Sequence, residues 1–293
     1  MKRAFTDLHI AVFLAGLTGI LGRLITLPEG PLVWWRMGIA SLALWLFAVV
    51  RGNAGLPKGK ALWSMAGIGA LTALHWTFFY ASIKYGNVSI GLVCFSAVSF
   101  FTAVLDPVLS HRRFDPVELM LGILVMLGIW LIFTFDARYT TGIILGMVSS
   151  ALCALFVILN KGVLMIHPQP VVTRTELTAG FLSLTFLLPL YVRHDPLRSL
   201  LPDGHDLFWL TVLALLCTVV AITLSNRALG RISPFTVNLT YNLEPVYGII
   251  LAFAVYHEYR DLGPSFYAGM TIIAATVLIQ SWRVLRKSRP FRR

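Results

Sequence analysis

The polar residues with the most chemical potential lie inside an apolar stretch towards the C-terminal end of the chain. Asn238, Tyr241 and Asn242 are spaced so that they share one face of a helix. Glu244 follows near the middle of the stretch, where a carboxyl group must be protonated, paired or in contact with water. Pro245 removes a backbone donor and predicts a kink beside these side chains. The cluster fits either a substrate or proton site or a hydrogen-bonded network that locks the kink.

A second polar group lies in the first half of the chain. Trp76 and Tyr80 are four residues apart and share a helix face, next to His75. Aromatic rings with polar tips suit a cavity for an amphiphilic solute, and they equally suit an aromatic belt at a membrane interface. Ser96 and Ser99 add hydroxyl groups one turn apart in the following stretch. We predict that the substrate-binding residues are His75, Trp76, Tyr80, Ser96, Ser99, Asn238, Tyr241 and Asn242, with Glu244 as a coupling residue and Pro245 as a hinge.

Other charged residues inside apolar stretches have simpler interpretations. Asp106 lies near the end of its stretch, where an ion pair with Arg112 or Arg113 is expected. Trp34-Trp35-Arg36 begins another stretch and is typical of an interface anchor.

Motifs for cofactor, metal or catalytic chemistry are missing from the sequence. There is no Gly-rich phosphate loop and no GxSxG motif, and His257-Glu258 lacks the second histidine of a zinc protease helix. Cys94, Cys153 and Cys217 lie in three different apolar stretches without metal-ligand spacing. We therefore expect no cofactor, no metal and no catalytic residue, and nothing indicates an ATP-driven machine.

The elements that position these residues are membrane-spanning helices. The chain has a mean hydropathy of +0.79, and 57% of its 293 residues are apolar against 13% charged, so a bilayer must be its solvent. About 20 apolar residues span a bilayer. The predicted spans are 8–26, 31–50, 62–83, 88–109, 118–135, 142–160, 171–192, 206–226, 233–256 and 264–283.

The net charge of +11 does not indicate nucleic-acid binding, because the cations lie at span ends rather than in one patch. With the N-terminus inside, the cytoplasmic side carries 17 Lys and Arg residues against 7 outside, six of the 17 in the last turns and tail. The sequence thus predicts a multi-pass protein of the cytoplasmic membrane with both termini in the cytoplasm.

The ten spans divide into two sets of five that resemble each other. Ile20-Leu21-Gly22-Arg23 ends the first span as Ile158-Leu159-Asn160-Lys161 ends the sixth, and Gly86-Asn87-Val88-Ser89 precedes the fourth as Gly230-Arg231-Ile232-Ser233 precedes the ninth. Because five is odd, the second set crosses the membrane in the opposite sense. The fold class is therefore an all-α polytopic membrane protein with two inverted five-helix repeats, the architecture of secondary transporters whose substrate site lies between the halves.

On these residues the chain resembles the drug/metabolite transporter superfamily, EamA type. The strongest block is Asn242-Leu243-Glu244-Pro245, supported by Arg36 and by the turns at Gly86 and Gly230. The resemblance covers two EamA-like halves at about 8–135 and 142–283, followed by a basic cytoplasmic tail at 284–293. It implies a central cavity lined by both halves, peripheral fifth and tenth helices, and a proton- or gradient-linked carrier of small organic solutes, often an exporter of amino acids.

The first half departs from this pattern, because Val98-Ser99 stands where the repeat would place Glu-Pro. Equivalent kinks and carboxylates are therefore not expected in both halves. The expected partners are a small-molecule substrate, the lipid bilayer and protons as a candidate coupling ion, with no nucleic acid and the oligomeric state open. The alternatives are an intramembrane enzyme acting on lipid-linked substrates and a membrane protein that transports nothing.

Overall fold

The computed structural model describes residues 2–133, 139–192, 200–241, 243–257, 259 and 263–287. Within these ranges the regular structure is helical and no strand occurs. In chain order the helices are α1 (Lys2–Leu24), α2 (Glu29–Val50), α3 (Lys60–Tyr85), α4 (Val88–Phe95), α5 (Val98–Leu109), α6 (Pro116–Phe133), α7 (Thr140–Leu164), α8 (Gln169–Val192), α9 (Gly204–Ala214), the π-helix η3 (Leu215–Val220), α10 (Ala221–Leu229), α11 (Pro234–Tyr241), α12 (Glu244–Tyr256) and α13 (Pro264–Lys287).

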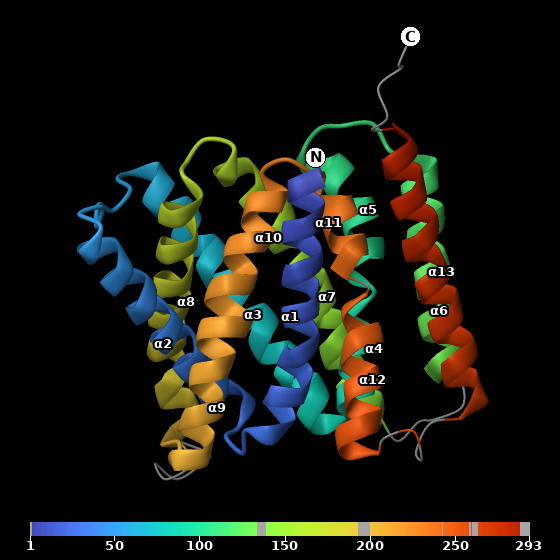
Figure 1. Cartoon of the computed structure of the whole chain (residues 1–293), viewed down its shortest axis with the longest axis horizontal. Helices are drawn as coiled ribbons and strands as arrows, with labels where there is room; N and C mark the ends of the chain where they lie inside the picture. Colours follow the sequence, from blue (N-terminus) through green and yellow to red (C-terminus); the bar gives the residue numbers. More distant parts are fainter. Residues whose placement is uncertain are drawn as a thin grey trace.

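These helices form the ten crossings that the sequence predicts. The pair α4–α5, the run α9–η3–α10 and the pair α11–α12 each make one crossing, and every other helix makes one alone. Seven crossings are long and apolar enough to span a membrane by length and composition, α6 and α13 contain shorter apolar segments, and the less apolar α3 is the tenth. The start of α1 and the end of α13 lie at the same end of the bundle (Figure 1), as an even number of crossings requires.

The two halves are inverted, and their last helices pair with each other. Because α1 is the first crossing and α7 the sixth, these two helices run in opposite directions. The last helices, α6 and α13, lie together at one edge of the bundle (Figure 1). A Cβ atom at Gly128 would lie 3.0 Å from the carbonyl oxygen of Gly269, so the two backbones touch there. The pair leaves the remaining eight crossings to form the centre.

The fourth and ninth crossings are both broken in the middle. The helix stops at Phe95 and resumes at Val98 in the first half, and it stops at Tyr241 and resumes at Glu244 in the second. The two stops, and likewise the two restarts, are separated by the same number of residues. The expectation that equivalent kinks would be missing was wrong, because the first half breaks its helix without a proline. The expected difference in carboxylates is present, since Val98 occupies the position of Glu244.

At the first-half break the backbone bonds shift by one residue, and serine hydroxyls add bonds to the carbonyls there. The amides of Ser96 and Ala97 bond three residues back, to Val93 and Cys94, which tightens the helix at this point. The hydroxyl of Ser150 on α7 donates to the carbonyl of Cys94 at 2.8 Å. The hydroxyl of Ser99 donates to the carbonyl of Ser96 at 3.0 Å. The carbonyls of Cys94 and Ser96 thus each accept a serine hydroxyl in addition to a backbone amide three residues further along the chain.

Candidate functional site

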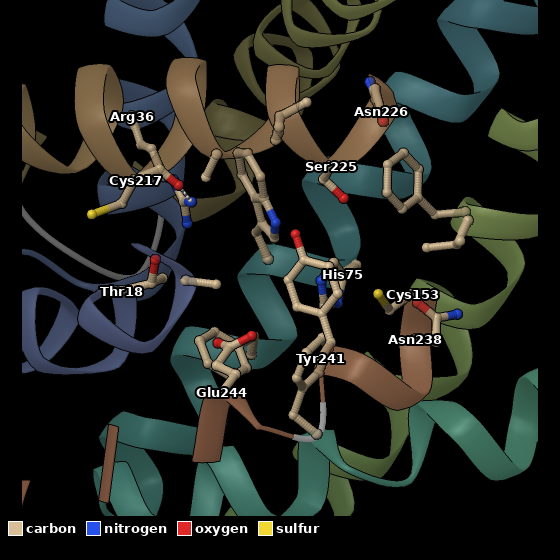
Figure 2. Close-up of a pocket in the computed structure, with 18 residues that line it drawn as sticks. Thr18, Arg36, His75, Cys153, Cys217, Ser225, Asn226, Asn238, Tyr241 and Glu244 are labelled. Carbon is tan, nitrogen blue, oxygen red and sulfur yellow. Dashed lines mark hydrogen bonds between the residues drawn. The ribbon is translucent and has the colours of Figure 1, made fainter. Parts of the chain in front are cut away.

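A central cavity lies between the two halves and is lined by helices of both. Its walls come from α1, α2, α3 and α4 in the first half and from α7, η3, α10, α11 and α12 in the second. The volume is about 100 Å³, several times the roughly 10–15 Å³ that a single water needs. The wall is mostly apolar, with polar side chains at a few places (Figure 2). This composition is typical of a site for a small organic molecule.

Among the lining residues that the structure describes, Arg36 is the one arginine. It is 3% exposed, and its Nε donates to the hydroxyl of Thr218 at 2.6 Å. Its Nη1 donates to the hydroxyl of Tyr80 at 2.8 Å, and its Nη2 to the carbonyl of Cys217 at 3.4 Å. The guanidinium carbon lies 3.8 Å from the centre of the Trp76 ring, a close cation–π contact. The interpretation of Arg36 as an interface anchor was wrong, because its charged group faces the protein interior.

Glu244 faces the same cavity from the first position of α12. It is 4% exposed, and no hydrogen bond or ion pair joins its carboxyl group to another residue in the described part of the chain. Tyr241 ends α11 directly before the break, and its hydroxyl points towards Ser225 (Figure 2). The break therefore places a carboxyl group and a phenol on one wall of the cavity. Asn242, which the sequence also predicts as a site residue, lies outside the described residues.

His75 and Asn238 line the cavity while holding the two halves together. Nδ1 of His75 lies 2.8 Å from the hydroxyl of Ser149, and the same hydroxyl donates to the carbonyl of His75 at 3.0 Å. The His75 ring also stacks on Phe95, with 5.5 Å between ring centres. Asn238 donates to the hydroxyl of Thr102 at 2.8 Å. Each residue thus bonds to the opposite half and contributes to the cavity wall.

Four of the predicted site residues lie beside the cavity rather than in its lining. Tyr80 is fully buried behind Arg36 and orients that side chain. Ser96 and Ser99 lie within the first-half break, and Pro245 lies in the first turn of α12. The structure brings together His75, Trp76, Asn238, Tyr241 and Glu244 as lining residues.

Four polar lining residues were missed as site residues by the sequence analysis: Thr18, Arg36, Ser225 and Asn226. Asn226 accepts a hydrogen bond from Asn160 at 3.1 Å and donates to Thr173 at 2.9 Å, so it belongs to a network that links α7, α8 and α10. The signal for Arg36 was present, because a charge one turn inside a span marks a functional position by default. The neighbouring tryptophans concealed that signal.

Asp106 lies near the end of the fourth crossing and forms the predicted ion pair. Nη2 of Arg112 lies 2.8 Å from one carboxylate oxygen of Asp106 and 2.9 Å from a carboxylate oxygen of Glu118. Ser110 donates to the other oxygen of Asp106 at 2.7 Å. This prediction is confirmed. Asp106 does not line the cavity, so Glu244 is the one carboxyl group among the lining residues that the structure describes.

A group of residues with metal-ligand types lies at the start of α9, away from the cavity. The ligand atoms of Asp203, His205 and Asp206 lie within 4.8 Å of one another. However, the two carboxylate oxygens of Asp206 accept hydrogen bonds from the backbone and hydroxyl of Thr26, at 2.9 and 2.8 Å. Asp203 caps the helix by accepting from the amide of Asp206 at 2.7 Å. These bonds give the group a structural role in joining α9 to the loop after α1.

Comparison with known proteins identifies the family and the fold. The model of the EamA-like transporter family matches residues 8–134 and again residues 140–282. A protein of known crystal structure is similar with a TM-score of 0.73 and 15% sequence identity, over 99% of this chain and 100% of that one. At this identity the likeness describes the fold alone. No curated protein matches the sequence.

Proposed function

The chain belongs to the EamA-like transporter family, and on that premise we propose that it exports small organic metabolites, such as amino acids, across the cytoplasmic membrane by alternating access. The observation that carries this proposal is the cavity between the halves. Arg36 and Glu244 place opposite formal charges in its wall, and Trp76 and Tyr241 add aromatic surface. Such a wall suits a solute with polar groups on an apolar body.

The cavity also argues against the two alternative functions. A membrane protein that transports nothing has no need of ionisable side chains in its interior, where burial is costly. An intramembrane enzyme would need facing carboxylates or a nucleophile next to a base. Among the described lining residues Glu244 is the one carboxyl group, and the His75 imidazole is bonded to Ser149.

The broken crossings suggest how access alternates. The breaks in α4–α5 and α11–α12 lie next to the cavity, so each half can change its angle there without disrupting a continuous helix. In this mechanism Pro245 is the hinge of the ninth crossing, and Glu244 carries the proton that couples transport to the gradient. The distribution of Lys and Arg residues supports a cytoplasmic location for both termini. We propose export rather than import because the resemblance implies a carrier that is often an exporter.

The first experiment compares metabolite levels inside and outside cells with and without the gene. The accumulated solute is then tested in proteoliposomes with the double variant Trp76→Ala/Tyr241→Ala. We expect its apparent affinity to fall about tenfold or more, because aromatic contacts in the cavity are lost. The double variant Trp63→Ala/Tyr267→Ala is the matched control, since both side chains are exposed on the outside of the bundle. Wild-type affinity in the cavity variant would remove both residues from the site.

A further inference from the structure

Arg36 carries a buried charge that no carboxylate neutralises in the part of the chain that the structure describes. Its guanidinium bonds to two hydroxyl groups and one carbonyl, all of them uncharged partners. Glu244 faces the same cavity without forming an ion pair with it. A buried charge without an ionised partner is strongly unfavourable, because it has lost its hydration and gained no counter-charge. A site that retains such a charge is incomplete without an anion.

Two of the three groups that bond to the guanidinium of Arg36 lie in the other half of the protein. Thr218 lies in η3, and its hydroxyl accepts from Nε of Arg36 while donating to the carbonyl of Leu213 at 2.8 Å. The carbonyl of Cys217, in the same π-helix, accepts from Nη2. Short π-helices occur frequently at functional sites. Here the π-helix presents a hydroxyl and a carbonyl to one guanidinium.

The bonds that hold Arg36 leave part of its guanidinium available. A guanidinium has five N–H groups, and the three bonds use Nε–H and one N–H on each terminal nitrogen. One N–H therefore remains on Nη1 and one on Nη2. Trp76 covers one face of the group, and the side chain borders the cavity (Figure 2). Both N–H groups belong to a planar cation, and carboxylate oxygens are the acceptors that a guanidinium binds most strongly.

We propose that Arg36 is the anion subsite of the cavity and binds the carboxylate group of the transported solute. Thr218 and Tyr80 are positioning residues, because they hold the guanidinium against Trp76 and away from Glu244. A released Arg36 would be free to pair with Glu244 across the cavity and close the subsite. The inference rests on the proposed transport function and adds to it the chemical group that the solute must carry.

The test uses full-length protein in lipid nanodiscs and probes matched in shape. The probes are leucine, leucinamide, 4-methylpentanoate and 3-methylbutylamine, with the same four end groups on a phenylalanine skeleton. We expect the carboxylate probes to bind and the amide and amine probes to bind about tenfold more weakly or worse, since a hydrogen bond to a charged group contributes about 1.5–3 kcal/mol. Arg36→Gln should remove this preference. Arg36→Lys, which keeps the charge without the planar fork, should restore part of it.

Controls separate the subsite from general damage to the fold. Arg51→Gln is the matched arginine variant, because Arg51 is exposed at the end of α2 and lies over Phe47. Thr218→Val should weaken carboxylate binding several-fold, about threefold to tenfold by the loss of one charged hydrogen bond, whereas Thr223→Val in α10 should not. Thr218→Ser should rescue binding. A merely structural role for Thr218 would lower the thermal stability without changing the preference for carboxylate over amide.

The outcomes separate the subsite from the transport function. Equal binding of carboxylate and amide probes, an unchanged preference in Arg36→Gln, or binding by no carboxylate probe would each overturn the anion subsite. Transport of the amide or amine probes in proteoliposomes would in that case leave the proposed function standing. If the solute identified in cells lacks a carboxylate and carries a phosphate or sulfonate instead, the assignment to carboxylates is wrong. Absence of transport for every probe and for the accumulated cellular solute would count against the proposed function itself.

Discussion

The broken fourth and ninth crossings have the same backbone shape and opposite chemistry. Both stop and restart at corresponding residues, and both end at a histidine in the left-handed conformation, His111 with φ 51° and His257 with φ 57°. In the first half, serine hydroxyls satisfy the carbonyls at the break. In the second half, Pro245 cannot donate a backbone bond, and Glu244 enters the cavity.

This difference shows that the inverted repeat preserves a place for bending rather than a residue type. Serine and proline break a helix by different means, one by competing for carbonyls and the other by removing a donor. The charged residues also differ between the two halves. The first half pairs Asp106 with Arg112 near the end of its crossing, and the second half leaves Glu244 facing the cavity without an ion pair among the described residues. The asymmetry therefore lies in where charge is available to a solute.

The largest expected effect is on the transport rate, and it concerns the carboxyl group that is present at the second-half break and missing at the first. Glu244→Gln should lower the transport rate about tenfold and flatten its pH dependence, because the variant cannot exchange a proton. Ser99→Ala, at the position of the first-half break that corresponds to Pro245, should change the rate by no more than about twofold, since it removes an uncharged hydroxyl and leaves the titratable groups of the cavity in place. The measurement is solute flux in proteoliposomes at several pH values.

Other titratable groups near Glu244 must be considered in reading that pH profile. Those that share the cavity or contact its wall are Arg36 on α2, His75 and Tyr80 on α3, Cys153 on α7, Cys217 in η3 and Tyr241 on α11. A His75→Gln variant therefore accompanies Glu244→Gln. If the rate and pH profile of Glu244→Gln equal those of the wild type, Glu244 has no coupling role. If only His75→Gln alters the profile, the coupling belongs to the first half.

The second prediction concerns a hydroxyl in the first-half break. The Oγ of Ser96 is buried and has no hydrogen-bond partner among the described residues, whereas the Oγ of Ser99 donates to the carbonyl of Ser96. Ser96→Ala should leave the stability unchanged or raise it, by up to about 1 kcal/mol, because an unsatisfied buried polar atom is removed. Ser150→Ala is the contrasting variant, since it leaves the Cys94 carbonyl without its 2.8 Å bond and should destabilise. Thermal unfolding in detergent measures both, and a clear loss in Ser96→Ala would indicate a partner for this hydroxyl.

The third prediction tests the proline of the second-half break. Pro245 lies in the first turn of α12, where its missing N–H leaves the carbonyl of Tyr241 without a helical partner. Pro245→Ala permits a continuous helix and should lower the transport rate about threefold with little change in apparent affinity, as expected when a conformational step is slowed. Pro264→Ala, in the first turn of the peripheral α13, is the control. An effect on affinity alone would assign Pro245 to the shape of the site instead.

Much of the fold could be predicted from the sequence, because apolar runs and repeated turns report directly on spans and on their inversion. The paired α6 and α13 also agree with the resemblance. The site was predicted in part: Trp76, Tyr241 and Glu244 stood out as polar tips in apolar stretches, and the structure places them on one cavity. Arg36 was interpreted as an interface anchor because two tryptophans precede it, and its partner Thr218 lies too far away in the sequence to correct that interpretation.

The first-half break was beyond sequence reasoning for a related reason. Its carbonyls are satisfied partly by Ser150, which lies on α7 in the other half. A proline announces a break in its own segment, whereas this break depends on a side chain that only the packing of the two halves brings near. The roles of the predicted site residues in transport remain predictions.

The smallest expected effect concerns the segment between α5 and α6, where the ion pairs continue beyond Asp106. Asp115 accepts from the amide of Val117 at 3.0 Å and pairs with Arg283 of α13. Partial burial acts to raise the pKa of Asp115, but the hydrogen bond and charge of Arg283, with the amides of Val117 and Glu118, outweigh it and hold the pKa below its ordinary 3.8. A lowered pKa means that the folded state favours the ionised form.

The contribution of Asp115 to stability should therefore be complete at neutral pH and above the ordinary value of 3.8, and it should be lost as the pH falls through the lowered pKa. Asp115→Asn keeps a side chain that caps α6 and loses the ion pair, so it should cost only a few tenths of a kcal/mol, about 0.3, at neutral pH. Asp115→Ala loses the cap as well and should cost about 1 kcal/mol. Thermal unfolding at two salt concentrations distinguishes the two contributions, because salt screens the pair and not the cap. Equal costs for both variants would mean that the ion pair, rather than the helix cap, holds this end of the first half to α13.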